Sequence, residues 1–179
     1  NLFWNRGMNL AFSKAMERDY DYYLWLNDDT LLYPDCLSNL FSTARQLSEN
    51  VNSKVIVVGS ICDPNTGTLN YGGLVKDSRW HRLKFRLLEP GDKPLPCDTM
   101  NGNCVLLTRD VVQVTGNLDP SFRHSIGDTD YGLRSVKNGC SIWIAPGYTG
   151  TCHANKGIIY YQKLSFREFF KKLNHPKGL

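Results

Sequence analysis

Apolar runs that alternate with amphipathic helical segments are the feature that most constrains the fold of this chain. Residues 22–26 and 54–61 are continuous runs of aromatic, aliphatic and β-branched residues, which is typical of buried strands. Between them, residues 34–47 begin at Pro34 and repeat apolar side chains every three or four positions, as one face of a helix does. Strands that alternate with helices predict an α/β architecture with a mainly parallel sheet flanked by helices.

The rest of the chain adds elements of both kinds. The patterns predict a helix over 8–16, a strand over 104–107, helices over 109–114 and 128–138, and a last strand over 140–145. Residues 80–87 alternate loosely, which is typical of a strand or of one arm of a hairpin. Gly139 stands where a left-handed residue commonly ends a helix. No repeat or linker divides this pattern.

Composition limits the classes of function. A hydrophobic fraction of 41% is enough to bury one core, and 179 residues fit a single domain better than two. The net charge of +4 falls far short of the basic stripe of a dedicated nucleic-acid binder, so we expect no nucleic-acid partner. The six cysteines form no Cys-x-x-Cys pair and no zinc-type spacing, which indicates buried reduced thiols.

The sequence also bears on location. No apolar run approaches the roughly 20 residues of a membrane span, and the first residues lack the layout of a signal peptide. We therefore expect a cytoplasmic protein. Because the chain does not begin with methionine and stops directly after a helix-like segment, we interpret it as a piece of a longer protein.

Two adjacent carboxylates, Asp28 and Asp29, follow Asn27 directly after the predicted strand at 22–26. Ligands of open α/β sheets gather outside the carboxyl ends of strands. A hard cation such as Mg²⁺ takes one or two carboxylates and completes its shell with water and substrate phosphate oxygens. The motif therefore predicts a site for a diphosphate and its metal. The alternative is a polar turn in which one aspartate caps the following segment.

A second pair of carboxylates, Asp128 and Asp130, stands at the start of a predicted helix. A hydroxyl that attacks an electrophilic carbon must lose its proton as the new bond forms, and one well-placed carboxylate can accept that proton. The alternative is structural, because both positions suit N-capping and a favourable interaction with the helix dipole. Arg134, one turn further on, is then a natural partner for Asp130.

The first carboxylate motif lies in the run Leu26-Asn27-Asp28-Asp29-Thr30, followed by Pro34-Asp35-x-Leu37. This run resembles the metal-binding segment of glycosyltransferase family 2. In that family an Asp-x-Asp-like triplet ends a strand, and its last carboxylate binds a divalent metal that bridges the donor diphosphate. The resemblance implies Asp29 as the main ligand of Mg²⁺ or Mn²⁺, with Asp28 assisting. Asn27 stands at the family's first acidic position, so Asn27 and Asp28 are expected beside the donor.

Three further segments resemble parts of the same family. They are Arg6-Gly7-Met8-Asn9, Asn101-Gly102-Asn103 with the strand that follows, and Thr151-Cys152-His153. The first is similar to the segment beside the nucleotide, which implies donor contacts from Arg6 and Asn9. The second is similar to the turn beneath the sugar, which implies that Asn103 contacts the sugar-nucleotide donor. The family places a metal- or diphosphate-contacting histidine where His153 lies, although a lone histidine is otherwise more often structural.

The most specific resemblance is the run Leu118-Asp119-Pro120-Ser121-Phe122, followed by Asp128-Thr129-Asp130-Tyr131-Gly132-Leu133-Arg134. In family 2 this region usually reads acid-Asp-x-Asp-x-x-x-Arg, and its first aspartate is the general base of an inverting transfer. The resemblance implies that Asp128 is this base. Gly127 stands where the family has the preceding acidic residue, which is a departure from the pattern.

Together these resemblances imply a GT-A-like (Rossmann-like) domain over residues 1–157 that lacks its first strand or strands. They imply an inverting glycosyltransferase, moving a hexosyl or deoxyhexosyl group from a nucleotide-diphosphate sugar to a hydroxyl of a glycan or lipid-linked acceptor in bacterial surface polysaccharide synthesis. Two alternatives remain open. One is a sugar nucleotidyltransferase, for which no Gly-rich phosphate loop is visible, and the other is a non-catalytic module that binds a glycan or a protein partner.

Residues 158–179 predict an amphipathic C-terminal helical segment, in which Phe166, Phe169, Phe170 and Leu173 share a face with basic residues beside it. Such a helix can lie at an anionic membrane surface, which predicts peripheral contact with the inner face of the membrane. The alternative, which we favour, is a terminal helix packed against protein.

Overall fold

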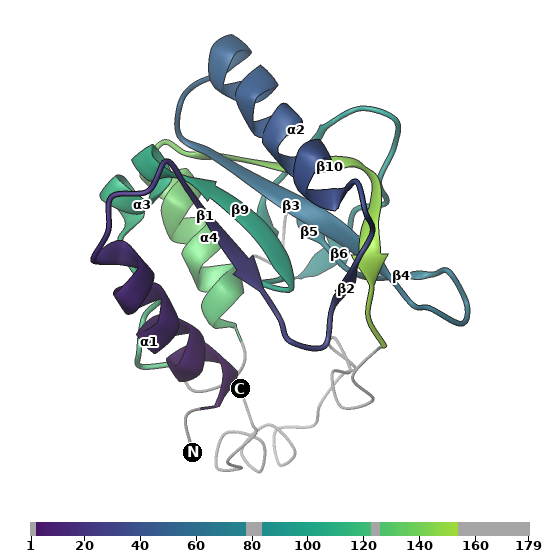
Figure 1. Ribbon diagram of the computed structural model, residues 1–179, viewed down its shortest axis with the longest axis horizontal. Coiled ribbons are helices and arrows are strands. Elements are labelled where there is room, and N and C mark those ends of the chain that lie inside the picture. The colour runs from purple at the N-terminus through teal and green to yellow at the C-terminus, as the bar shows by residue number, and fades with distance from the viewer. Residues whose placement is uncertain (1–2, 78–83, 123–125, 154–179) are drawn as a thin grey trace.

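The computed structural model of the chain describes residues 3–77, 84–122 and 126–153 (Figure 1). The predicted helical segment over 158–179 and the first part of the strand predicted over 80–87 lie outside these residues. The described helices are α1 (Trp4–Met16), α2 (Cys36–Asn50), α3 (Arg109–Thr115) and α4 (Gly127–Lys137). All four confirm helices that the apolar periodicity predicts.

The main sheet has seven strands, five of which follow the order β1-β9-β3-β10-β2. Their bounds are β1 (Tyr22–Leu26), β2 (Leu31–Leu32), β3 (Val55–Cys62), β9 (Cys104–Thr108) and β10 (Ser141–Thr151). The other two are β4 (Leu69–Tyr71), paired with β3, and β7 (Leu95–Cys97), paired with β10. A smaller sheet has the order β6-β5-β8, from β5 (Gly73–Lys76), β6 (Phe85–Leu87) and β8 (Thr99–Met100).

The protein is mixed α/β, as predicted, but the expectation of a mainly parallel sheet is wrong. Among the described strands, only β3 and β10 pair in parallel, and β9 lies antiparallel between β1 and β3. The first residue of β9, Cys104, lies opposite the last residue of β1, Leu26, and its last residue, Thr108, lies opposite Tyr22, so β9 runs back through the sheet. The chain between β3 and β9 includes the strands of the smaller sheet, and it returns to the main sheet through residues 101–103.

These directions bring several loops together. Because β9 is antiparallel to both β1 and β3, and β10 is parallel to β3, the strands β1, β3 and β10 all run the same way. Their carboxyl ends therefore meet at the edge where β9 begins, which we call the carboxyl edge. Residues 27–30, 101–103 and 152–153 all lie there, and the opposite side of the sheet is the amino edge (Figure 1).

Helices cover both faces of the main sheet, and β3 supplies side chains to both. All eight residues of β3 are buried. Strand side chains alternate between faces, so Ile56 and Val58 join the core under α1, α3 and α4, while Val55 and Val57 join the core under α2. This double coverage explains why residues 54–61 read as a continuous apolar run in the sequence. Within the described residues, no helix combines the length and apolar character needed to cross a membrane.

Aromatic packing fixes the position of α1 against β1. Phe12 of α1 lies edge-on to Tyr23 and Trp25, with ring centroids 5.7 and 5.3 Å apart. Tyr131 of α4 also lies edge-on to Trp25, with ring centroids 4.7 Å apart. Such pairs are worth about 0.5–1.5 kcal/mol each beyond the area they bury. The cluster packs α1 and α4 against β1.

Candidate functional site

At the carboxyl edge, both predicted carboxylate motifs contact the same backbone turn, residues 101–103. The backbone N–H of Asn27 donates to the carbonyl of Asn103 at 3.0 Å, which ties the end of β1 to the turn before β9. The backbone N–H of Gly102 in the same turn donates to Oδ2 of Asp128 at 2.9 Å. Asn103 itself is buried. Residues 27–29 and Asp128, almost a hundred positions apart, are thus held by neighbouring residues.

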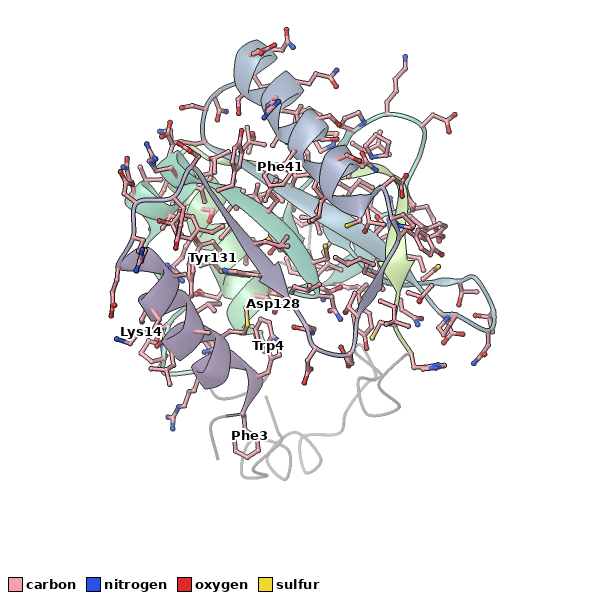
Figure 2. The ribbon with its side chains drawn as sticks, viewed as in Figure 1. Phe3, Trp4, Lys14, Phe41, Asp128 and Tyr131 are labelled. Carbon is pink, nitrogen blue, oxygen red and sulfur yellow. The ribbon has the colours of Figure 1, made fainter. Side chains whose placement is uncertain are left out.

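Trp4 joins the same cluster from the first turn of α1. Its indole Nε1–H donates to Oδ1 of Asn27 at 2.7 Å. A Cβ atom added to Gly102 would lie 2.5 Å from both Cζ2 and Cη2 of Trp4, so the indole rests against the backbone of that glycine. Figure 2 shows Trp4 and Asp128 close together below the end of β1. We call Trp4, Asn27, Gly102 and Asp128 the edge cluster.

Asp128 has the properties expected of a base. Burial raises its pKa above the usual value for aspartate, although the N–H groups of Gly102 and Thr129 donate to its two oxygens at 2.9 and 2.8 Å and act in the opposite direction. Desolvation disfavours the charged carboxylate, so the ionised group binds a proton more readily than an exposed one. A raised proton affinity brings a carboxylate closer to the range that suits a general base near neutral pH.

Asn5 fills the space beside Gly127, the position where the resemblance to glycosyltransferase family 2 leads to the expectation of an acidic residue. The Asn5 Nδ2 donates to the carbonyls of Asp119 and Phe122 at 2.7 and 2.9 Å, which fixes this side chain between α1 and the segment before α4. A Cβ at Gly127 would lie 1.8 Å from the Asn5 Oδ1, so a glutamate or aspartate has no room at this position. Ile126, directly before it, has a left-handed φ of 74°, which is rare for a β-branched residue.

Asp28 and Asp29 lie exposed after β1, and the end of β10 approaches them. The thiol of Cys152 lies beside the Asp29 carboxylate; burial in the first place, and then that carboxylate, raise the pKa of Cys152 to about 11. His153, the next residue, is exposed. Two adjacent exposed carboxylates are the oxygen donors that Mg²⁺ and Mn²⁺ accept, with substrate phosphate completing the shell. Within the described residues, no group of three His, Cys, Asp or Glu side chains is placed to hold a metal by itself.

The structure places the other predicted donor-contacting residues away from this cluster. Arg6 is exposed, and its Nε donates to the carbonyl of Pro120 at 3.3 Å. Asn9 donates from Nδ2 to the carbonyl of Leu118 at 2.6 Å. Both side chains bind the backbone of residues 118–120, so in this state they stabilise the packing of α1 against that segment. Their contact with a nucleotide stays a prediction.

Asp130 has the structural role that the sequence offered as the alternative, as the ion-pair partner of Arg134. It forms an ion pair with Nε of Arg134 at 2.7 Å, one helical turn away. Arg134 also donates to the carbonyls of Thr115 and Asn117, each at 3.1 Å. The guanidinium therefore joins α4 to the end of α3. Of the two acidic residues at the start of α4, Asp128 is the one that reaches the edge cluster.

Trp4 and Cys152 are the members of this region that the sequence pattern did not single out. Trp4 lies two positions before the run Arg6-Gly7-Met8-Asn9 and outside the helix predicted over 8–16, so it carries no signal of its own. Cys152 carries no such signal, because a single cysteine next to a histidine has no spacing that identifies it.

No protein-family model matches this chain, and no curated protein matches it significantly. The edge cluster and the residues that form it are therefore the features of this chain that bear on its function.

Proposed function

We propose that this chain is the metal-binding and acceptor-side part of an inverting glycosyltransferase that uses a nucleotide-diphosphate sugar. The single observation that carries this proposal is the edge cluster, in which Trp4 and Gly102 join the Asn27–Asp29 segment to Asp128. Each motif suits one half of a glycosyl transfer, since one offers oxygen ligands for a metal diphosphate and the other offers a base. Their meeting at the carboxyl edge, where α/β sheets bind ligands, supports a common site.

Asp128 is the proposed general base. In an inverting transfer the acceptor oxygen forms its bond to the anomeric carbon while the bond from that carbon to the diphosphate breaks. The proton of the acceptor hydroxyl passes to one carboxylate oxygen of Asp128. Because the pKa of Asp128 is raised by burial, this carboxylate is a stronger base than an exposed aspartate. The reaction needs no covalent intermediate on the protein.

Asp29, with Asp28 beside it, is the proposed holder of Mg²⁺ or Mn²⁺. Both carboxylates are exposed at the carboxyl edge, so they can reach a diphosphate without giving up an existing ion pair within the described residues. A cation bound there would neutralise the negative charge that builds on the departing diphosphate. His153 lies next to Cys152, whose thiol is beside Asp29, and is proposed as a further contact.

The finer fold assignment is also a proposal: a GT-A-like sheet that continues beyond β1. Within the described residues, β1 pairs only with β9, and its outward side chains Leu24 and Leu26 are 37% and 40% exposed. A groove of about 450 Å³ runs between β1 and α1. The side of β1 that does not pair with β9 has room for the additional strand or strands of such a sheet. We further propose a role in bacterial surface polysaccharide synthesis, which rests on the resemblance described above.

The experiment that tests this function is sugar release from UDP-, GDP- and dTDP-hexoses in the presence of Mn²⁺ and, in parallel, of EDTA. The proposal predicts release from one nucleotide class, which stops with EDTA and with Asp29→Ala. Asp19→Ala is the matched control, because Asp19 is an aspartate paired with Arg109 at the amino edge, and it should release sugar at the wild-type rate.

Two other outcomes would contradict the proposal. Formation of pyrophosphate from a sugar 1-phosphate and a nucleoside triphosphate would identify a nucleotidyltransferase. Binding of a glycan, without turnover of any of the three donors, would identify a binding module.

A further inference from the structure

The hydrogen bond between Trp4 and Asn27 determines which way the Asn27 amide faces. An indole N–H is a donor and has no acceptor function, so the Asn27 atom that receives it at 2.7 Å must be the amide oxygen. The amide nitrogen of Asn27 therefore points away from Trp4. Toward a ligand at the carboxyl edge, the Asn27 side chain can therefore act as a hydrogen-bond donor.

Hydrogen bonds hold the backbone of Asn27 in place on both sides. Its N–H donates to the carbonyl of Asn103 at 3.0 Å, and its own carbonyl accepts from the N–H of Thr30 at 3.2 Å. With the main chain held on both sides, rotation of the side chain is the motion that remains. The bond to Trp4 is the contact that selects one rotation.

Trp4 is in turn held by the residue that contacts the proposed base. Its ring rests on the backbone of Gly102, and the Gly102 N–H donates to Oδ2 of Asp128. The orientation of the Asn27 amide is thereby linked to the position of Asp128.

We propose that Trp4 is a positioning residue, which turns the Asn27 amide nitrogen toward the ligand so that it donates a hydrogen bond to an oxygen of the diphosphate. This inference rests on the proposed function. It distinguishes Asn27 from the carboxylate that the resemblance places at this position, because an amide N–H binds a phosphate oxygen whereas a carboxylate repels it or binds a metal. Asn27 then acts on the diphosphate directly, and the metal is left to Asp28 and Asp29.

The test is calorimetric titration of UDP, GDP and dTDP, each with Mn²⁺, into the wild-type chain and four variants: Trp4→Phe, Asn27→Ala, Asn27→Asp and the double variant Trp4→Phe/Asn27→Ala. Trp4→Phe keeps a ring against Gly102 and removes the N–H, so the Kd should rise about 5-fold, the factor typical of one hydrogen bond. Asn27→Ala should raise the Kd by at least as much, and the double variant should bind no more weakly than Asn27→Ala.

Asn27→Asp separates the two roles of this position. A carboxylate accepts the Trp4 N–H as well as an amide does, so the fold is preserved, but its second oxygen faces the diphosphate with a negative charge. We expect the Kd to rise by about 10-fold or more. Trp143→Phe is the matched control, since the Nε1 of Trp143 has no hydrogen-bond partner within the described residues, and it should leave the Kd unchanged.

Three results would overturn the inference. Equal or tighter binding by Asn27→Asp would assign Asn27 to the metal. A Trp4→Phe effect of the same size with and without Asn27→Ala would show that Trp4 supports the fold without acting through Asn27. Wild-type affinity in Trp4→Phe would remove its role and leave the proposed function standing, whereas failure of the wild type to bind any of the three nucleotides would remove both.

Discussion

The two edges of the main sheet use their charged side chains in different ways. At the amino edge, Arg109 binds Asp19 and Asp21 at 3.0 and 2.9 Å and also donates to two backbone carbonyls. At the carboxyl edge, Asp28 and Asp29 are exposed and form no ion pair with a described residue. Charges that are held in ion pairs contribute to structure, and carboxylates that form no ion pair with a described residue can accept a cation.

Asp128 adds a second difference between the edges. Asp128 is partly buried and desolvation raises its pKa, and groups with such shifted pKa values cluster at functional sites. At the amino edge, Asp19 and Asp21 are instead exposed and paired with Arg109. If this comparison is correct, substitutions at the carboxyl edge change activity and binding, and substitutions at the amino edge change stability by small amounts.

The largest effect is expected from Asp128→Asn. An amide cannot accept the acceptor proton, so the rate of sugar transfer should fall about 10²- to 10⁴-fold, while the KM for the donor changes little. The measurement is steady-state kinetics with the donor that supports release. Asp130→Asn is the control, since Asp130 pairs with Arg134, and a comparable loss of rate in this variant would contradict the special role of Asp128.

The next effect concerns pH. The base must be ionised to act, and burial raises the pKa of Asp128, so activity should fall as the pH drops through a value above the roughly 3.9 of a free aspartate. A profile of kcat/KM against pH, in the range where the fold is intact, measures this acidic limb. The residual activity of Asp128→Asn should lack it, and the same limb in that variant would assign it to another group.

A smaller effect, mainly on stability, is expected from Gly102→Ala. The added Cβ would lie 2.5 Å from the Trp4 ring, so the ring must move, at a cost of about 1–3 kcal/mol in the free energy of unfolding. Nucleotide binding should weaken with it. Chemical denaturation measures the first quantity. Gly91→Ala is the matched control, because its Cβ would meet no described atom closer than 3.8 Å, and equal destabilisation of both variants would contradict this packing.

The smallest effect is expected from Arg109→Ala at the amino edge. Its partly exposed ion pairs are worth about 0–1 kcal/mol each, so the free energy of unfolding should fall by about 1 kcal/mol. Nucleotide affinity should stay at the wild-type value, as titration can show. A change in affinity as large as that of a carboxyl-edge variant would remove the distinction between the two edges.

Local patterns were sufficient to predict the elements, and non-local geometry explains the errors. The sequence pattern predicted β1, α2 and β3 from residues 22–26, 34–47 and 54–61. Burial of one face leaves an apolar periodicity in the sequence, and burial of both faces leaves a continuous apolar run. The direction of β9 left no such trace. It depends on the end of the main sheet at which the chain returns from the smaller sheet, and no local pattern in residues 63–103 signals that end.

The candidate site was predictable in part for the same reason. The positions of Asp28, Asp29 and Asp128 at element ends could be inferred from motif and resemblance. The contact of Trp4 with Asn27 joins residues 23 positions apart and has no periodic signature. Arg6 and Asn9 were predicted as donor contacts from local resemblance, yet their side chains bind the backbone of residues 118–120, a segment whose proximity only the fold reveals.

The measurement that tests the central claim most directly is calorimetric titration of UDP, GDP and dTDP, with and without Mn²⁺, into the wild-type chain and Asp29→Ala. The account predicts that one nucleotide binds with Mn²⁺, that its affinity falls at least about tenfold without the metal, and that Asp29→Ala binds weakly under both conditions. Binding that is equally tight with and without Mn²⁺, or unchanged in Asp29→Ala, would contradict a metal-diphosphate site at the carboxyl edge.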